Sequence, residues 1–176
     1  MGLAMTFAHF VVSQSSLLVC TAVTAASANS VAALKAGDTL RSRRRRFTEN
    51  DVAAYAGVSS DRNPVHLDDA FARGVGGFQR DRVVHGMLIA SLFPALITSH
   101  FPRAVGICQS LKFAAPVYIG DEVVAQVQAL HIKAAGARHI VKFATKCFTA
   151  DEETLAIDGE AMASLPTLQL STEAID

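Results

Sequence analysis

The sequence has few cysteines, and they form no recognisable pattern. Cys20, Cys108 and Cys147 are odd in number, far apart and never spaced as Cys-x-x-Cys. This argues against a disulfide framework and against a structural zinc site. A reducing compartment fits this usage best. Cys108 and Cys147 fall in strand-like stretches, so we expect them to be core residues rather than reactive thiols.

The chain also lacks net charge, because 16 basic residues balance 16 acidic ones. The whole chain therefore has no bulk electrostatic preference for nucleic acid or for a membrane surface. Residues 41–46 include five arginines and have a rival interpretation as a nucleic-acid arm. No second basic cluster and no interleaved aromatic residues accompany that run. We expect neither a nucleic-acid nor a membrane partner.

Acidic residues are absent before Asp38, and residues 1–37 are rich in Ala, Ser, Thr and Val. This composition is typical of an N-terminal leader, and we expect an organellar transit peptide over residues 1–37 followed by one domain over residues 38–176. Small residues at positions 26–28 give some support to a secretory signal, although its positive n-region is missing. Polar residues 13–16 interrupt the apolar run before it reaches the roughly 20 residues that a bilayer requires.

The first half of the domain is predicted to be mainly helical. Thr48 and Asp51 form an N-cap pattern for a short helix through Tyr55, after a short strand over residues 43–47. Residues 68–73 predict one helical turn. Residues 86–98 are apolar nearly all round, which predicts a helix covered on most sides and bent by Pro94.

The second half alternates with the period of a β-strand. Four successive strands are predicted at residues 107–113, 123–129, 141–147 and 155–161. Turn signals at residues 120–121, 135–136 and 150–151 separate them and indicate antiparallel pairing. One buried helix ahead of an antiparallel sheet predicts an α+β domain in which the sheet wraps a central helix, the outline of a single hot-dog fold.

The stretch from Asp61 to His66 carries the first candidate catalytic residues. Asn63-Pro64 fixes a turn, because proline locks its own φ and moves the preceding residue out of helical geometry. A carboxylate beside an imidazole can hold a water molecule, with one group withdrawing a proton while the other returns one to carbon. For either residue alone, a loop-capping Asp or a packed His is the simpler alternative.

Gly86, at the start of the apolar helix, is a candidate oxyanion donor. Its missing side chain lets a ligand approach the backbone, and amides at a helix N-terminus stabilise the negative oxygen that develops beside a thioester. Ser91 is expected either to bond the thioester region or to bond back to a backbone carbonyl. His85 is expected to be structural.

Together these motifs resemble the MaoC-like, R-specific enoyl-thioester hydratase/dehydratase family of hot-dog proteins. The shared segments are Asp61-x-Asn63-Pro64-x-His66, Val84-His85-Gly86-Met87-Leu88, residues 109–113 and residues 120–123. The resemblance covers roughly residues 38–165. It implies that Asp61 and His66 are catalytic, that the Gly86 amide binds the thioester oxygen and that Ser91 lies in the same pocket. We also expect Asn63 to bind the substrate. The resemblance further implies no metal or cofactor, and a homodimer whose sheets join edge to edge. The family often has Gly where this chain has Ser60.

Within that family, one short domain behind an organellar leader is most similar to plant-type mitochondrial dehydratases. The resemblance implies reversible dehydration of an (R)-3-hydroxyacyl thioester, carried by acyl carrier protein or CoA, in the mitochondrial matrix. Two alternatives remain open. One is a hot-dog acyl-thioesterase, for which the helix offers only Ser91 or Thr98. The other is a non-catalytic acyl-thioester-binding subunit.

Overall fold

The computed structural model describes residues 32–149 and 154–171. Most of the predicted leader, residues 1–31, and the turn predicted at residues 150–151 lie outside the described residues. None of the helices in the described ranges is long and apolar enough to cross a membrane.

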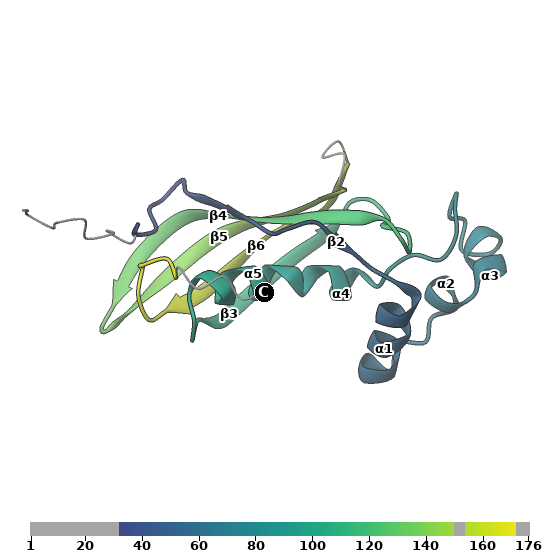
Figure 1. The fold of residues 1–176 in the computed structure, drawn as a ribbon, viewed down its shortest axis with the longest axis horizontal. Helices are drawn as coiled ribbons and strands as arrows, with labels where there is room; N and C mark the ends of the chain where they lie inside the picture. Colours follow the sequence, from purple (N-terminus) through teal and green to yellow (C-terminus); the bar gives the residue numbers. More distant parts are fainter. Residues whose placement is uncertain (1–31, 150–153, 172–176) are drawn as a thin grey trace, which may run out of the picture. The chain divides into compact units, whose positions relative to one another are not determined.

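One antiparallel sheet forms the body of the domain (Figure 1). Its strands are β1 (Thr39–Arg41), β2 (Arg45–Arg46), β3 (Val105–Phe113), β4 (Glu122–Ala135), β5 (Arg138–Thr149) and β6 (Leu155–Leu165). The order is β1-β4-β5-β6-β3, and β2 also pairs with β4. The four strands predicted in the second half are confirmed, and each is longer than predicted.

The pairing of β3 differs from the sequence prediction. The turn signal at residues 120–121 suggested that β3 would pair with β4, but β3 pairs with β6. Eight residues, 114–121, separate the two strands, whereas a tight hairpin needs two to five. The connection holds to other elements instead: the amide of Ala114 donates to Ala156 and that of Gly120 donates to Phe47. β3 therefore becomes an edge strand of the sheet.

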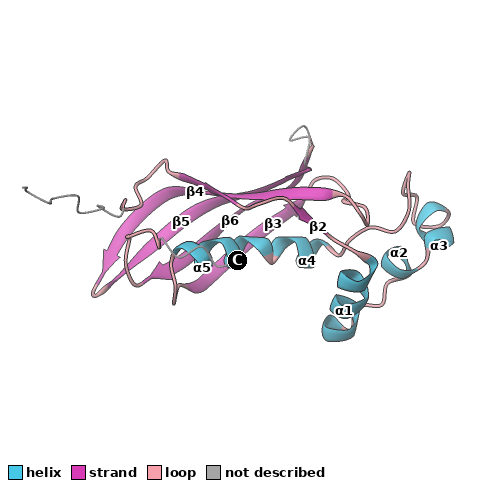
Figure 2. Cartoon of the chain, viewed as in Figure 1, coloured by secondary structure: helices cyan, strands magenta, loops and turns pink. Residues whose placement is uncertain are grey.

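Five helices complete the described fold, namely α1 (Glu49–Ser59), α2 (Pro64–Leu67), α3 (Asp69–Arg73), α4 (Gly86–Ala90) and α5 (Leu92–His100). The capping box predicted for α1 is present, since Thr48 Oγ1 accepts from the Asp51 amide and the Asp51 carboxylate accepts from the Thr48 amide. α1 runs four residues beyond the predicted end at Tyr55. Figure 2 shows α1, α2 and α3 beyond one end of the sheet.

The predicted central helix is present as α4 and α5, with a short interruption at Ser91. Pro94 has no amide hydrogen to donate to the carbonyl of Ala90, which weakens the helix one turn before the proline. Ser91 keeps helical angles, with φ −61° and ψ −17°, so α5 continues the line of α4 (Figure 1).

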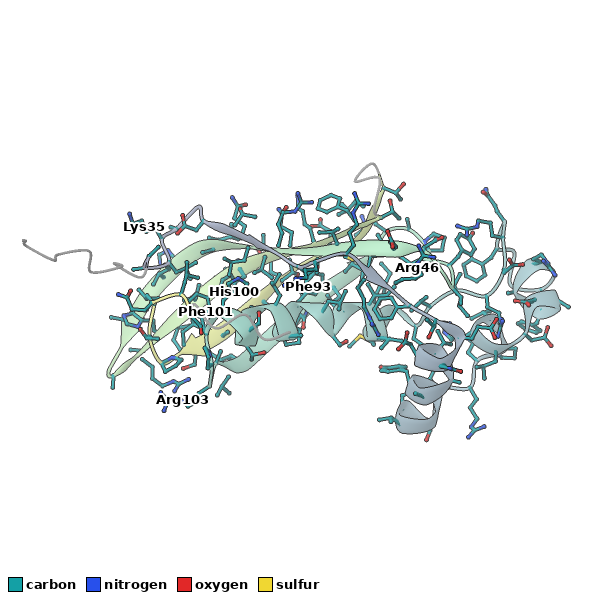
Figure 3. The ribbon with its side chains drawn as sticks, viewed as in Figure 1. Lys35, Arg46, Phe93, His100, Phe101 and Arg103 are labelled. Atoms are coloured by element: carbon teal, nitrogen blue, oxygen red, sulfur yellow. The ribbon has the colours of Figure 1, made fainter. Side chains whose placement is uncertain are left out.

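The core lies between this helix and the concave face of the sheet. Phe93, which projects from α5 toward the sheet, and Phe143 on β5 are both fully buried (Figure 3). The prediction that the helix is covered on most sides is wrong for the single chain. Met87 is 55% exposed, and Ser91, Pro94, Ala95 and Thr98 are exposed on the face away from the sheet.

The two cysteines of the described residues have different surroundings. Cys147 is buried, as predicted, and burial raises the pKa of its thiol to about 12. The prediction that Cys108 is a core residue is wrong, because it is exposed. Alternation places a residue on one face of a strand, but only the tertiary packing decides whether that face is covered. Cys108 lies on β3, at the edge of the sheet.

The folded part begins before Asp38. Leu34 is 2% exposed within the core, and its amide donates to the carbonyl of Leu168. Residues 32–37 therefore pack on the domain. The arginine run that follows is partly neutralised, since Arg45 pairs with Asp51 and Arg46 pairs with Glu122.

Candidate active site

The loop between α1 and α2 carries the carboxylate of the site. Ser59 Oγ donates to the carbonyl of Tyr55 and accepts from the amide of Asp61, which ties the loop to the end of α1. Ser60 has a φ of +61°, a left-handed conformation that costs a non-glycine residue free energy. Glycine would adopt this conformation without that cost.

The structure brings Asp61 and His66 together as predicted. Asp61 Oδ2 lies 4.0 Å from His66 Nε2, and the two side chains are 51% and 12% exposed respectively. This distance is too long for a direct hydrogen bond. A water oxygen at ordinary hydrogen-bond length from both atoms fits between them. The pair is thus arranged to hold one water molecule with a carboxylate and an imidazole.

The hydrogen bond made by Nδ1 of His66 determines which tautomer the neutral ring adopts. Nδ1 lies 2.8 Å from the carbonyl oxygen of Val83. A carbonyl can only accept, so Nδ1 carries the hydrogen of the neutral ring. Nε2 then bears a lone pair on the side of Asp61, which is the form that can take a proton from water.

His85, which was not predicted as a site residue, lies directly beside this pair. Its ring is stacked on His66, with centroids 3.8 Å apart, and Tyr55 packs on it at 4.9 Å. His85 Nε2 lies 3.1 Å from the main-chain carbonyl of Asp61 and therefore donates to it. Burial lowers the pKa of His85, and the neighbouring His66 lowers it further, whereas the bond to Asp61 opposes the shift.

A cavity of about 490 Å³ opens beside the two histidines. Its wall is mainly apolar, with a few polar side chains at one place, as is usual for sites that bind small molecules. The residues that line it include Tyr55, Asp61, Phe78, Val84, Ile89, Phe113, Pro116 and Ile157, together with His66, His85, Gly86 and Met87.

Gly86 lies in the cavity wall, at the first position of α4. The first amides of a helix have no carbonyl one turn earlier to bind. The Gly86 amide therefore makes no hydrogen bond within α4. The ring of Phe113 lies against this glycine so closely that no side chain would fit without moving it. The residues that gather here therefore combine a water-holding pair with a main-chain donor.

The two other predicted binding residues are not among those that line the cavity. Asn63 Oδ1 accepts from the amide of Val65 and caps α2. Ser91 Oγ donates to the carbonyl of Leu88, which is one of the two roles considered for it. Ser91 lies on the exposed face of the central helix. Direct substrate contacts by Asn63 and Ser91 remain predictions.

The site residues that were not predicted from the sequence all carry aromatic rings. They lie on elements other than the loop that holds Asp61. Tyr55 comes from α1, His85 from the segment before α4, and Phe113 from the end of β3. The one available signal was the position of His85 between an apolar strand-like stretch and Gly86. Its stacking on His66 depends on tertiary structure and has no sequence pattern.

Asp61, His66 and His85 place one possible metal ligand each within 4.8 Å of one another. His85 Nε2 is already used as the donor to the Asp61 carbonyl, and the lone pair of the ring lies on Nδ1, which is buried in the protein. The two remaining ligands are fewer than the three protein ligands of a catalytic zinc site. The donor set therefore suits proton transfer better than metal binding.

An antiparallel sheet around a central helix, with a carboxylate and an imidazole at one cavity, defines a hot-dog protein. The chain belongs to the MaoC like domain family, whose model matches residues 31–151.

Two curated relatives carry names that describe related reactions. One is a 3-hydroxyacyl-[acyl-carrier-protein] dehydratase, mitochondrial, from Arabidopsis thaliana, 51% identical over 137 residues, which are 78% of this chain and 81% of the relative. The other is an (R)-specific enoyl-CoA hydratase from Aeromonas caviae, 42% identical over 69% of this chain and 89% of the relative. A solved (R)-hydratase from A. caviae superposes with a TM-score of 0.68 at 40% identity, covering 76% of this chain and 98% of that one.

Proposed function

We propose that the protein catalyses the reversible dehydration of an (R)-3-hydroxyacyl thioester to the trans-2-enoyl thioester. The observation that carries this proposal is the 4.0 Å gap between Asp61 Oδ2 and the lone pair of His66 Nε2 at an apolar cavity. The relatives named as dehydratases and hydratases support the reaction type and its stereochemistry.

In the hydration direction, Asp61 and His66 hold the water, and its oxygen attacks C3 of the enoyl group. One member of the pair takes a proton from the water, and the pair then delivers that same proton to C2 of the enolate. In the dehydration direction, the pair removes the proton from C2 and protonates the hydroxyl on C3, which leaves as water. Protons balance within the pair, so the scheme needs no external acid or base.

Negative charge develops on the thioester oxygen in either direction. The Gly86 amide, at the start of α4 and in the cavity wall, is the proposed donor to that oxygen. A second cavity of about 250 Å³ lies farther along the central helix and is lined by apolar residues that include Phe93, Ile97 and Ala161. Its apolar lining suits the hydrocarbon part of an acyl substrate.

The test follows the absorbance of the enoyl-thioester band as the enzyme acts on crotonyl-CoA or crotonyl-acyl carrier protein. The protein used starts at Ala32. Asp61→Asn and His66→Ala should each lower kcat by about 10²- to 10⁴-fold. His100→Ala is a matched control, because this partly buried histidine lies on α5 and does not line the cavity. Wild-type turnover in both site variants would refute the proposal.

Thioester hydrolysis is less well supported by the geometry. The hydroxyl of Ser91 donates to the carbonyl of Leu88, and that of Thr98 donates to the carbonyls of Pro94 and Ala95. Neither hydroxyl is thereby directed to a base. Assay of free thiol in the same reactions separates hydrolysis, which releases it, from dehydration, which does not.

We propose a homodimer in which the β3 strands of two copies join. β3 is last in the strand order, so one side of it has no partner strand within residues 32–149 and 154–171. Val105, Ile107 and Phe113 on β3 are each more than half exposed, as is Met87 on the uncovered face of the helix. A second copy would cover both surfaces.

We further propose a mitochondrial location and acyl carrier protein as the acyl carrier. The carrier rests on the name of the Arabidopsis relative, and the location rests on that name and on the absence of acidic residues from residues 1–37. Comparing kcat/KM for crotonyl-acyl carrier protein and crotonyl-CoA tests the carrier. Microscopy of the full chain with a C-terminal fluorescent protein, against the same fusion from Ala32, tests the location.

A further inference from the structure

We propose that His85 is a positioning residue for the catalytic pair, because its Nε2–H holds the main-chain carbonyl of Asp61 and so sets the place of the carboxylate relative to His66. The inference rests on the proposed function, since it assigns a role within the same reaction. The residue acts through Asp61 and is not itself a catalytic group.

The position of Asp61 has little support from its own loop. The amide of Asp61 donates to Ser59 Oγ, and its Oδ1 accepts from the amide of Asn63. The first bond joins Asp61 to the last residue of α1, and the second lies within the loop itself, so both are local in the chain. Among the hydrogen bonds of the described residues, the one from His85 is the one that ties Asp61 to a distant element, 24 residues along the chain.

His85 is itself rigidly held. Its side chain is 2% exposed and packs against the rings of His66 and Tyr55. Its main-chain carbonyl accepts from the amides of Leu88 and Ile89 and so begins the helical bonding of α4. The buried side chain of His85 cannot move together with the Asp61 loop. A displacement of that loop would therefore break the hydrogen bond between His85 Nε2 and the Asp61 carbonyl.

The same contact links Asp61 to the oxyanion donor. His85 directly precedes Gly86, so one residue fixes the carboxylate, stacks on the imidazole and leads into the main-chain amide. Nδ1 of His85 is buried without a hydrogen-bond partner among the described residues, and Nε2 is used by Asp61. Neither nitrogen is left for proton exchange with substrate, which is why the role is positional.

The test compares His85→Gln with His85→Asn. Both substitutions introduce an amide, but the Gln amide reaches the position of the imidazole Nε2, whereas the Asn amide is one methylene too short to donate to the Asp61 carbonyl. We expect kcat of His85→Asn to fall about 10²-fold, as for a misplaced catalytic group, with KM changed less than about threefold. His85→Gln should retain kcat within about fivefold of the wild type.

His85→Phe gives a second measurement in case the Asn variant folds poorly. Phenylalanine keeps a flat ring beside His66 but has no donor, so its kcat should match that of the Asn variant. Melting temperatures establish that each protein is folded, and His100→Ala is the control for loss of a histidine elsewhere. Equal kcat in the Gln, Asn and Phe variants, or a loss confined to KM, would overturn the inference. An inactive wild type would instead refute the proposed function.

Discussion

Gly86 and Phe113 occupy adjoining space that leaves no room for a side chain. A β-carbon placed on Gly86 would lie 2.5 Å from Cε1 of Phe113 and 2.7 Å from its Cδ1. The ring is 53% exposed in the single chain, so it can turn away, but it then leaves its place in the cavity wall. The glycine therefore lets the helix amide and the aromatic wall lie side by side.

Gly86→Ala should lower kcat/KM by about tenfold or more, because the displaced ring disturbs the site. Phe113→Ala removes the overlap, so the double variant should be no worse than Phe113→Ala alone. Steady-state kinetics of the four proteins in a double-mutant cycle measure this coupling. If the effects of the two substitutions simply multiply, the steric explanation is wrong.

Ser60→Gly should stabilise the protein by about 1 kcal/mol, because glycine adopts the positive φ of this position without strain. Thermal or denaturant unfolding measures the change. Ser60→Ala is the matched control: it also carries a β-carbon, so its stability should stay within about 0.5 kcal/mol of the wild type. A gain of the same size in Ser60→Ala would point away from the backbone conformation.

The lowered pKa of His85 predicts how stability depends on pH. The unfolded chain protonates this histidine near its ordinary value of 6.5, whereas the folded protein does so only at lower pH. The unfolded state therefore binds more protons below pH 6.5, and this residue's contribution to stability is lost as the pH falls. The limiting slope is about 1.4 kcal/mol per pH unit.

Melting temperatures of wild type and His85→Gln between pH 7.5 and about pH 5 isolate this contribution. The fall with pH should be shallower in the variant, because glutamine does not titrate. Parallel curves would assign the acid sensitivity to other groups.

Ile107→Lys should separate the proposed dimer, because a charge on an edge strand opposes strand pairing between copies. Ile107 is 52% exposed and lies on the free edge strand β3. Light scattering after size-exclusion chromatography should give the mass of one chain for the variant and of two for the wild type. Leu130→Lys, at an exposed position on the interior strand β4, should remain dimeric. A monomeric wild type would refute the dimer.

The local elements of the fold are readable from the sequence because their causes are local. Period-two alternation predicted β3 to β6, and Thr48 with Asp51 predicted the start of α1. The candidate catalytic residues were accessible for a similar reason. Asp61, His66 and the turn between them lie within six consecutive residues, and Gly86 begins a helix that its own apolar pattern predicts.

Only the tertiary structure decided which strands pair and which side chains are in contact. Alternation is identical for a central strand and an edge strand, so it did not indicate that β3 pairs with β6 or that Cys108 is exposed. The contacts of His85 with Tyr55, Asp61 and His66 join the residue before α4 to a stretch, residues 55–66, that is distant in the sequence. The sequence by itself determined which residues can carry proton transfer, because side-chain chemistry is intrinsic. Only the packing of distant segments decided the distances and tautomers, because these depend on contacts between residues that no local pattern relates.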